Sequence, residues 1–291
     1  MIIVKLIGGL GNQMFQYALG RHLAMKNNST LKLDIQGFKS YKLRNYDLNC
    51  FNIQENIATS KDLAEVSLPS DRFIRKLRKN LEVKINGVQQ IQYIKERKKD
   101  FQLEILNLGD NIYLEGYWQS EKYFSDIKDV IKKEFTVKNR PDSINESFME
   151  EIIDCESVSV HIRRGDYVSN PTTNQVHGFL GLEYYQKALN LMLEKIDNPH
   201  FFVFSDDPEW GERNIKIDAP ITYIKHNDAK NYEDIRLMNT CKHHIIANSS
   251  FSWWGAWLSK NKDKVVIAPK KWFNVDTFDT EDRYVASWVR L

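Results

Sequence analysis

The sequence has no long apolar run and no excess of charge of either sign, and each absence excludes a class of protein. No segment approaches the ~18 apolar residues that span a bilayer, and no basic start precedes a short apolar stretch as in a signal peptide. The 41 basic and 39 acidic residues give a formal charge of +2. Proteins that bind nucleic acid through phosphate contacts carry a large basic excess, so we expect no nucleic-acid partner.

Cysteine is also scarce. Cys50, Cys155 and Cys241 are an odd number, lie far apart in the sequence and have no metal-ligand spacing. This pattern indicates reduced thiols in the core. Together with the missing signal peptide and membrane span, it predicts a cytoplasmic protein.

The composition, 42% hydrophobic and 27% charged, is that of a globular protein, and 291 residues are enough for two domains. Residues 1–35 predict a strand, a glycine turn, a helix and a second strand. The segment that follows is irregular, and its basic stretch 71–104 is expected to be helical and solvated. Apolar content falls near residues 137–143, where a proline appears. We place the boundary there, with domains at 1–140 and 141–291.

In the second domain, short apolar runs alternate with helical patterns. Parallel strands need crossover connections, so this alternation predicts a doubly wound parallel α/β sheet. The predicted strands are 158–162, 201–204, 221–224, 244–247 and 265–268, and the predicted helices are 183–196, 208–214, 231–241 and 249–259.

Polar residues follow three of these strands, at the sheet edge where ligands bind in open α/β folds. Arg163 and Arg164 supply planar donors that suit phosphate oxygens. Ser249 and Ser250 begin a helix, whose free N–H groups favour an anion. Asp206 follows another strand and suits a ribose hydroxyl or a base N–H. Together these residues indicate an anionic ligand that carries hydroxyl groups.

Each of these residues also has a purely structural interpretation. One arginine could pair with Asp166, and the two serines could be ordinary N-caps. Asp206 and Asp207 could be turn residues at the surface. No single motif decides between the two interpretations.

The glycines near the start exclude two classes of nucleotide-binding protein. Gly8-Gly9-Leu10-Gly11 lacks the spacing of the dinucleotide fingerprint, and no P-loop ending in Gly-Lys-Ser/Thr is present. The turn still lets backbone come close to a ligand, and the amides of Asn12 and Gln13 could bond sugar or phosphate. The alternative is a plain strand-to-helix turn with an asparagine cap.

Metal ligands are poorly represented. His243 and His244 are adjacent and therefore point differently. Asp206 and Asp207 lack the Asp-x-Asp spacing of metal-dependent sugar transferases. We therefore expect a site with no metal and no cofactor.

Four motifs carry a resemblance to a known family. Residues 161–167 (HIRRGDY) resemble the peptide shared by α1,2- and α1,6-fucosyltransferases and protein O-fucosyltransferases. Residues 8–18 (GGLGNQMFQYA), 116–124 (GYWQSEKYF) and 248–258 (NSSFSWWGAWL) are similar to bacterial α1,2-fucosyltransferases of glycosyltransferase family 11. The motifs are spread over nearly the whole chain, so the resemblance applies to both domains.

The resemblance implies two Rossmann-like domains facing across a cleft, the GT-B type, with the donor site in domain 141–291 and the acceptor side in domain 1–140. It implies inverting, metal-independent transfer of L-fucose from GDP-β-L-fucose to the 2-hydroxyl of a terminal galactoside, as in O-antigen or other surface polysaccharide biosynthesis. Two alternatives stay open. One is a transferase that uses another nucleotide sugar, and the other is a non-catalytic protein of this fold that binds a nucleotide sugar or a glycan.

Matching motif positions assigns the donor site. The resemblance implies that Arg164 binds the β-phosphate and acts in catalysis, that Arg163 supports it, and that His161 lies near the nucleoside. Fixed cations stabilise the charge that grows on a departing diphosphate more in the transition state than in the ground state. The other donor-binding residues are Asn12, Asp206, Asn248, Ser249, Ser250 and Phe251.

The acceptor side is assigned to the two N-terminal motifs. We expect Gln13, Trp118, Gln119 and Glu121 to bind a galactose-containing glycan. The segment between residues 36 and 140 would set which natural acceptor is used.

The general base stays open. Asp166 is the first choice and His177 the next, with Glu115 and Glu121 as further candidates. The nearby arginines would lower the pKa of Asp166 and make it a poor base, so an orienting ion pair is the alternative role. The acceptor could also lose its proton late, to the departing phosphate.

The basic residues between 72 and 99 indicate one further partner. Lys and Arg side chains near an anionic leaflet favour membrane association. If the acceptor is carried by a lipid, this stretch would lie at the cytoplasmic face of the inner membrane. The alternative is an ordinary solvated helical surface.

Overall fold

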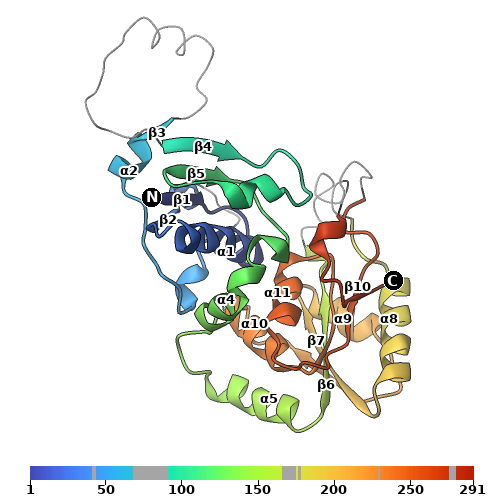
Figure 1. Ribbon diagram of the computed structural model, residues 1–291. Helices are drawn as coiled ribbons and strands as arrows, with labels where there is room; N and C mark the ends of the chain where they lie inside the picture. Colours follow the sequence, from blue (N-terminus) through green and yellow to red (C-terminus); the bar gives the residue numbers. More distant parts are fainter. Residues whose placement is uncertain (41–43, 68–90, 166–174, 176–177, 229, 275–279) are drawn as a thin grey trace, which may run out of the picture. The chain divides into compact units, whose positions relative to one another are not determined.

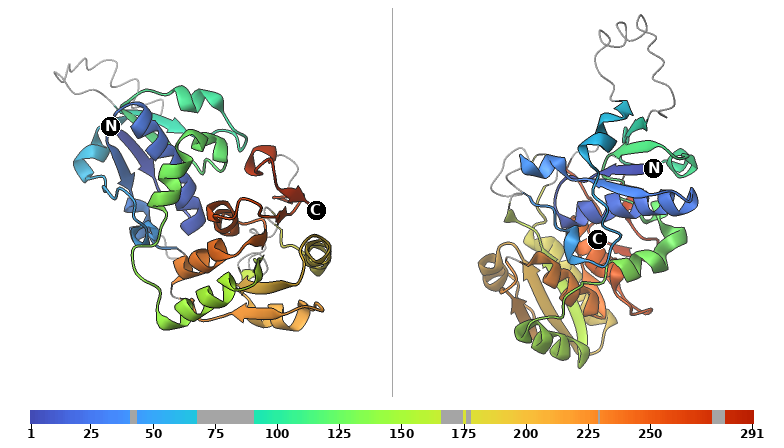
Figure 2. Two further views of the ribbon diagram at one scale, coloured as in Figure 1. Left: turned by 60° about the horizontal axis from the view of Figure 1, so that its bottom comes forward. Right: turned by 90° about the vertical axis from the view of Figure 1, so that its left-hand side faces the viewer.

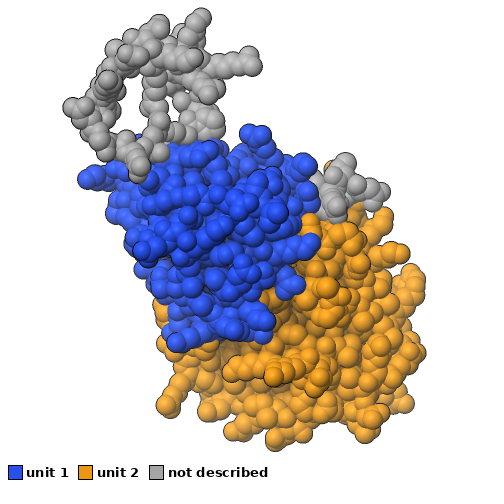
Figure 3. All heavy atoms as spheres, viewed as in Figure 1, with its two compact units in different colours: residues 1–135 blue, residues 136–291 orange. Residues whose placement is uncertain are grey.

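The computed structural model describes the chain apart from residues 41–43, 68–90, 166–174, 176–177, 229 and 275–279 (Figure 1). Its packing divides the chain into two compact units, unit 1 (Met1–Phe135) and unit 2 (Thr136–Leu291), shown in Figure 3. Each unit contains one parallel sheet with helices packed against it.

Unit 1 is built on a parallel sheet with the strand order β2-β1-β5-β4-β3. Its strands are β1 (Ile2–Lys5), β2 (Leu31–Asp34), β3 (Val66–Ser67), β4 (Ile91–Lys95) and β5 (Ile112–Glu115). Its helices are α1 (Leu10–Lys26), α2 (Ser60–Ala64) and α4 (Lys128–Glu134), with short 3-10 helices η1 (Gln36–Lys39), η2 (Leu48–Cys50), η3 (Leu103–Asn107), η4 (Glu121–Tyr123) and η5 (Ser125–Ile127).

Helix α1 packs directly on the strands of this sheet. A Cβ added to Gly20 would lie 2.3 Å from Val4 Cγ2 and 2.8 Å from Leu31 Cδ1, so glycine permits this close approach. The Tyr17 hydroxyl donates to Glu134 Oε2 at 2.6 Å, which joins α1 to α4. These contacts hold the middle of α1 against the sheet and against α4.

The prediction for the middle of unit 1 was partly wrong. Strand β4 lies within the basic stretch that was expected to be helical, and β5 lies in the segment described as irregular. In β4, the alternation of apolar Ile91 and Tyr93 with polar Gln92 is too short to predict a strand, because charged residues surround it in the sequence. In β5, Ile112–Glu115 is a short apolar run, which periodicity cannot tell from a piece of helix. Most of the basic stretch lies outside the described residues.

Unit 2 is built on a second parallel sheet with the strand order β11-β10-β9-β6-β7-β8. Its strands are β6 (Glu156–Ile162), β7 (Pro199–Ser205), β8 (Ile221–Ile224), β9 (His243–Ile245), β10 (Val266–Ala268) and β11 (Val289–Arg290). Its helices are α5 (Ser143–Ile153), α8 (Leu182–Lys195), α9 (Pro208–Asn214), α10 (Asn231–Thr240), α11 (Ser250–Leu258) and the 3-10 helix η6 (Glu281–Arg283).

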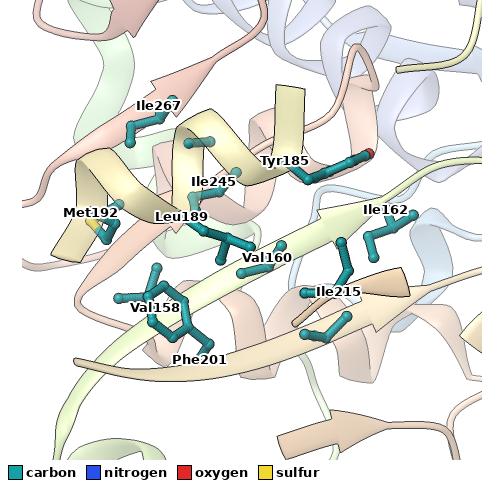
Figure 4. Packing of buried hydrophobic residues seen from close by; sticks show 12 residues of the cluster. Val158, Val160, Ile162, Tyr185, Leu189, Met192, Phe201, Ile215, Ile245 and Ile267 are labelled. Carbon is teal, nitrogen blue, oxygen red and sulfur yellow. The ribbon is translucent and has the colours of Figure 1, made fainter. Parts of the chain in front are cut away.

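The two faces of β6 meet different helices because its side chains alternate. Val158 and Val160 pack against α8 through Leu189, in the cluster shown in Figure 4. His161 points to the other face, where its ring lies 5.7 Å from that of Phe251 in α11. Figure 2 shows α10 and α5 on this side of the sheet and α8 across from them.

The five strands and four helices predicted for the second domain are present, and none of their ends differs from the prediction by more than two residues. The two-residue strand β11 was not predicted, because so short an element carries no periodic pattern. Two Rossmann-like α/β units confirm the predicted fold class.

Two further features concern the thiols and the membrane. Cys50, Cys155 and Cys241 are free thiols, and Cys241 is buried.

Among the described helices, none combines the length and apolar composition that crossing a bilayer requires.

A polar network joins α5 to α10 in unit 2. Asn145 and Asn227 exchange two hydrogen bonds of 3.0 Å, and Asn227 Nδ2 donates to Asp234 Oδ1 at 2.9 Å. Burial raises the pKa of Asp234 to about 7, against the lowering effect of the Asn227 bond, and the carboxylates of Asp228 and Glu233 add to the rise. Below about pH 7 the protonated form of Asp234 is therefore favoured in the folded protein.

We expect Asp234→Asn to stabilise the protein at pH 8 but not at pH 4. The folded carboxyl binds a proton below about pH 7, and the unfolded one only below about 3.8, so wild type loses stability as pH rises between these values. The amide does not titrate and avoids this loss, which we put at about 1–2 kcal/mol for a side chain in partial contact with solvent. Urea unfolding at pH 4, 6 and 8 measures the difference, and a constant difference would contradict the account.

Candidate active site

Three adjacent strands of unit 2 end in the polar residues that the sequence singled out. The strand order places β6 between β9 and β7, and the register pairs Ile162 of β6 with Ser205 of β7. Arg163 and Asp206 therefore leave neighbouring strands at the same edge. The helix that follows β9 begins there with Ser249 as its N-cap.

Asp206 holds the first arginine. Its Oδ2 lies 2.8 Å from Arg163 Nη1, and its Oδ1 accepts the backbone N–H of Arg164 at 2.8 Å. A Cβ on Gly165 would come within 2.6 Å of Asp206 Oδ2, so glycine allows the carboxylate this close approach. The structure thus uses both oxygens of Asp206 to position the arginines, and its assignment to ribose or guanine stays a prediction.

The second arginine is held by α9. Arg164 Nε lies 3.2 Å from Asp207 Oδ2, while Asp207 Oδ1 accepts the N–H of Trp210 at 3.1 Å and caps the helix. The guanidinium carbon lies 4.2 Å from the ring centroid of Trp210 and 5.6 Å from that of Phe179. An ion pair and two aromatic rings therefore fix the plane of the Arg164 guanidinium.

His161 is buried beside this pair. Burial lowers the pKa of His161 to about 4; the charge of Arg163 also lowers it, and Asp206 acts the other way. The imidazole is thus neutral at physiological pH. Its Nδ1 has no hydrogen-bond partner in the part of the chain that the structure describes. A neutral ring offers one N–H donor and one acceptor.

The start of α11 confirms the capping interpretation of Ser249. Its Oγ accepts the N–H of Phe251 at 3.3 Å. Asn248 is buried, and its Nδ2 lies 3.2 Å from the carbonyl oxygens of Gly178 and Trp272. Asn248 therefore anchors two loops, and capping by Ser249 leaves the prediction of donor binding at this helix end open.

In unit 1 the predicted acceptor residues fall into two groups. Gln13 is buried, and its amide donates to the carbonyl oxygens of Gly8 and Asn45 and accepts the N–H of Asp47. All three partners are backbone groups, so this side chain stabilises the local fold of unit 1. Trp118 is also fully buried. Gln119 Nε2, by contrast, donates to Asn12 Oδ1 at 2.5 Å, which brings together side chains from two motifs. Binding of an acceptor by any of these residues stays a prediction, as it does for Glu121 in η4.

The candidates for a general base differ in what the structure shows. Asp166 and His177 lie outside the described residues. Glu115 ends β5, and Lys5 Nζ lies 3.0 Å from its Oε2. Burial acts to raise the pKa of Glu115, but hydrogen bonds from Lys5 and Tyr93 outweigh it and hold the pKa below its usual value. A carboxylate held in this way is a weak base.

Two residues of unit 2 were missed by sequence reasoning. Trp210 supports Arg164 from the first turn of α9, and the only available signal was an aromatic residue three positions after Asp207. Asp234 is an acidic group with a raised pKa in α10, which no sequence motif marks. For metals, no group of three or more His, Cys, Asp or Glu side chains with suitable geometry occurs within the described ranges.

Comparison with solved structures bears on the fold. Fucosyltransferase NodZ from Bradyrhizobium superposes with a TM-score of 0.51 at 13% identity, covering 87% of this chain and 91% of that one. A variant of Arabidopsis thaliana FUT1, solved in complex with GDP, gives 0.55 at 11% identity, covering 94% and 72%. At these identities the likeness shows the fold alone, which agrees with the predicted GT-B type.

Comparison with curated sequences bears on the family. An Escherichia coli alpha-1,2-colitosyltransferase is 36% identical over 297 residues, covering 100% of this chain and 99% of that protein. The Escherichia coli O-antigen biosynthesis glycosyltransferase WbnK is also 36% identical, covering 98% and 99%. Mouse galactoside 2-alpha-L-fucosyltransferase Sec1 is 27% identical over 63% of this chain and 52% of its own. The sequence profile described as Glycosyl transferase family 11 matches residues 1–291, so the chain belongs to glycosyltransferase family 11.

Proposed function

We propose that this glycosyltransferase moves L-fucose from GDP-β-L-fucose to the 2-hydroxyl of a terminal galactoside, with inversion to the α-linkage. The observation that carries the proposal is the arginine pair that follows β6, held by the two aspartates that follow β7. Arg163 and Arg164 are each bound to an aspartate, so their positions are set before a ligand arrives.

This arrangement suits a diphosphate leaving group. In the transfer, the acceptor oxygen bonds to C1 of the sugar, the bond from C1 to the β-phosphate oxygen breaks, and GDP leaves with the bonding electrons. Negative charge therefore grows on the diphosphate. Guanidinium groups that are already oriented stabilise that charge without reorganising in the transition state, which lowers the barrier.

His161 and α11 complete the proposed donor site. The neutral imidazole can donate one hydrogen bond to a phosphate or ribose oxygen without adding charge. Ser249 caps a nine-residue helix that begins with Ser250 and Phe251, and the N-terminal end of such a helix favours an anion. The solved FUT1 variant of this fold binds GDP, which supports the choice of nucleotide.

The acceptor must lose the proton of its attacking hydroxyl. We keep Asp166 as the first choice for this base and His177 as the second, because Glu115 is held by Lys5. The galactoside and the 2-hydroxyl are supported by the relative named as a galactoside 2-alpha-L-fucosyltransferase. The O-antigen relative favours a surface-polysaccharide glycan as the natural acceptor, met in the cytoplasm or at the inner face of the membrane.

Colitose is the second candidate for the transferred sugar. A relative that is 36% identical over the whole chain is named as an alpha-1,2-colitosyltransferase. Colitose is L-fucose without its 3-hydroxyl group, so both sugars have the same ring configuration at C1, C2 and C4. The same diphosphate site could serve both donors, and only contacts to the 3-hydroxyl would distinguish them.

A panel of donors with lactose as acceptor tests the proposal. GDP-fucose, GDP-colitose, GDP-mannose and UDP-galactose are supplied separately, and products are identified by mass and linkage analysis. We expect an α1,2-linked trisaccharide from GDP-fucose at the highest kcat/KM. Preference for GDP-colitose would move the assignment to the second candidate. Binding of GDP by calorimetry without any transfer would leave a non-catalytic binding protein.

Arg164→Ala should lower kcat by about 10²–10³-fold, because it removes one fixed donor to the leaving group. Arg164→Lys should restore little, because an ammonium cannot keep both the Asp207 bond and the stacking on Trp210. Arg290→Ala is the matched control, since Arg290 also pairs with a carboxylate and lies 5.0 Å from an aromatic ring, that of Tyr284. Wild-type kcat in a folded Arg164→Lys variant would disprove the planar role.

Activity should survive excess EDTA, with little stimulation by Mg²⁺. In the proposed site, arginines and a helix end hold the diphosphate, where metal-dependent enzymes use carboxylates to hold a cation. Steady-state rates with and without chelator measure this. Loss of turnover with EDTA, and its recovery with Mn²⁺, would make Asp206 and Asp207 metal ligands and overturn their role in holding the arginines.

A further inference from the structure

We propose that Glu96 is a positioning residue for the acceptor side of unit 1. Its carboxylate sets the conformation of residues 116–120, the acceptor loop, and through that loop the place of Gln119 beside Asn12. The inference rests on the proposed function, because it takes the acceptor of the transfer to meet this loop.

Glu96 and the acceptor loop leave neighbouring strands at the same sheet edge. Strand β4 ends at Lys95 and β5 ends at Glu115, and these two residues are paired in register. Glu96 Oε2 accepts the backbone N–H of Tyr117 at 2.8 Å, and its Oε1 accepts that of Trp118 at 3.1 Å. Each oxygen of one carboxylate thus fixes one peptide group of the loop.

The Glu96 carboxylate is removed from solvent and its charge is balanced. Its side chain is 4% exposed, and Lys99 Nζ lies 3.1 Å from Oε2. Lys99 Nζ also lies 4.7 Å from the ring centroid of Tyr117. The ammonium therefore contacts both the Glu96 carboxylate and a side chain of the acceptor loop. A buried charge with three donors is costly to disturb, which makes this a rigid attachment.

The acceptor loop held by Glu96 is strained. Trp118 has φ +54°, a left-handed conformation that costs a side chain of this size roughly 1–2 kcal/mol. Its buried Nε1 has no hydrogen-bond partner among the described residues. A Cβ on Gly116 would lie 2.4 Å from Glu96 Cβ. A strained backbone conformation persists only where several surrounding contacts hold it, and such conformations occur most often at functional sites.

Helix α1 holds the same loop from its other side. Gln16 Nε2 donates to the carbonyl oxygen of Gly116 at 2.9 Å, and Gln119 Nε2 donates to Asn12 Oδ1 at 2.5 Å. Two amide side chains from different motifs are thereby placed together at the carboxyl ends of β1 and β5. Amides both donate and accept, which suits the hydroxyl groups of a sugar.

Glu96→Gln is the direct test, because an amide keeps one acceptor oxygen and turns an NH₂ group toward a backbone N–H. We expect the KM for lactose to rise about tenfold or more while the Kd for GDP stays within about twofold. Glu134→Gln is the matched control. It also alters a buried carboxylate of unit 1, which bonds Tyr17 and Arg21, and it should lower stability without changing the KM for lactose.

A second variant covers the case in which Glu96→Gln does not fold. Glu96→Asp keeps the charge but is shorter, and should raise the KM for lactose less than the amide does. Hydrogen exchange at the N–H groups of Tyr117 and Trp118 should become faster in Glu96→Asp and stay slow in Glu134→Gln.

An unchanged KM for lactose in folded Glu96→Gln, or an equal rise in Glu134→Gln, would overturn the inference. Failure of this inference can be told apart from failure of the proposed function. If wild type transfers no sugar, the proposed function fails, and lactose binding by saturation-transfer NMR still compares wild type with the variants. Absence of lactose binding to wild type, or equal binding by wild type and Glu96→Gln, would overturn the inference in that case.

Discussion

Two arginine–aspartate pairs join the ends of β6 and β7, and the site of unit 2 depends on them. Each aspartate acts twice: Asp206 bonds Arg163 and the backbone of Arg164, and Asp207 bonds Arg164 and caps α9. Without these carboxylates, two adjacent guanidinium groups would repel each other and turn toward water. With them, the cations stay fixed before an anion arrives, which is the condition for charge stabilisation without reorganisation.

Unit 1 also uses a carboxylate in this way, and there both of its oxygens hold backbone N–H groups. The Glu96 carboxylate accepts two N–H groups of the loop after β5, as the aspartates accept the donors of the loop after β6. In both units a carboxylate from one strand end holds the segment that follows the neighbouring strand. Parallel sheets make this arrangement available, because their carboxyl ends lie at one edge.

Sequence patterns were sufficient for most of unit 2 and for predicting which of its polar residues lie together at one sheet edge. Apolar runs predicted the central strands. Because parallel strands have their carboxyl ends at one edge of the sheet, the residues that follow them, Arg163, Asp206 and Ser249, were expected to lie together. The partners of each residue could not be predicted, because the Arg163–Asp206 bond depends on the register of β6 against β7. Glu96 was missed for a related reason, since its role exists only once β4 is recognised as the neighbour of β5.

Binding of GDP and of GMP, compared by calorimetry, tests the central claim most directly. If the fixed arginines recognise the β-phosphate, GDP should bind wild type at least about tenfold more tightly than GMP. The same comparison on Arg164→Ala should show this ratio reduced to near one. Equal affinity of wild type for GDP and GMP would contradict the account.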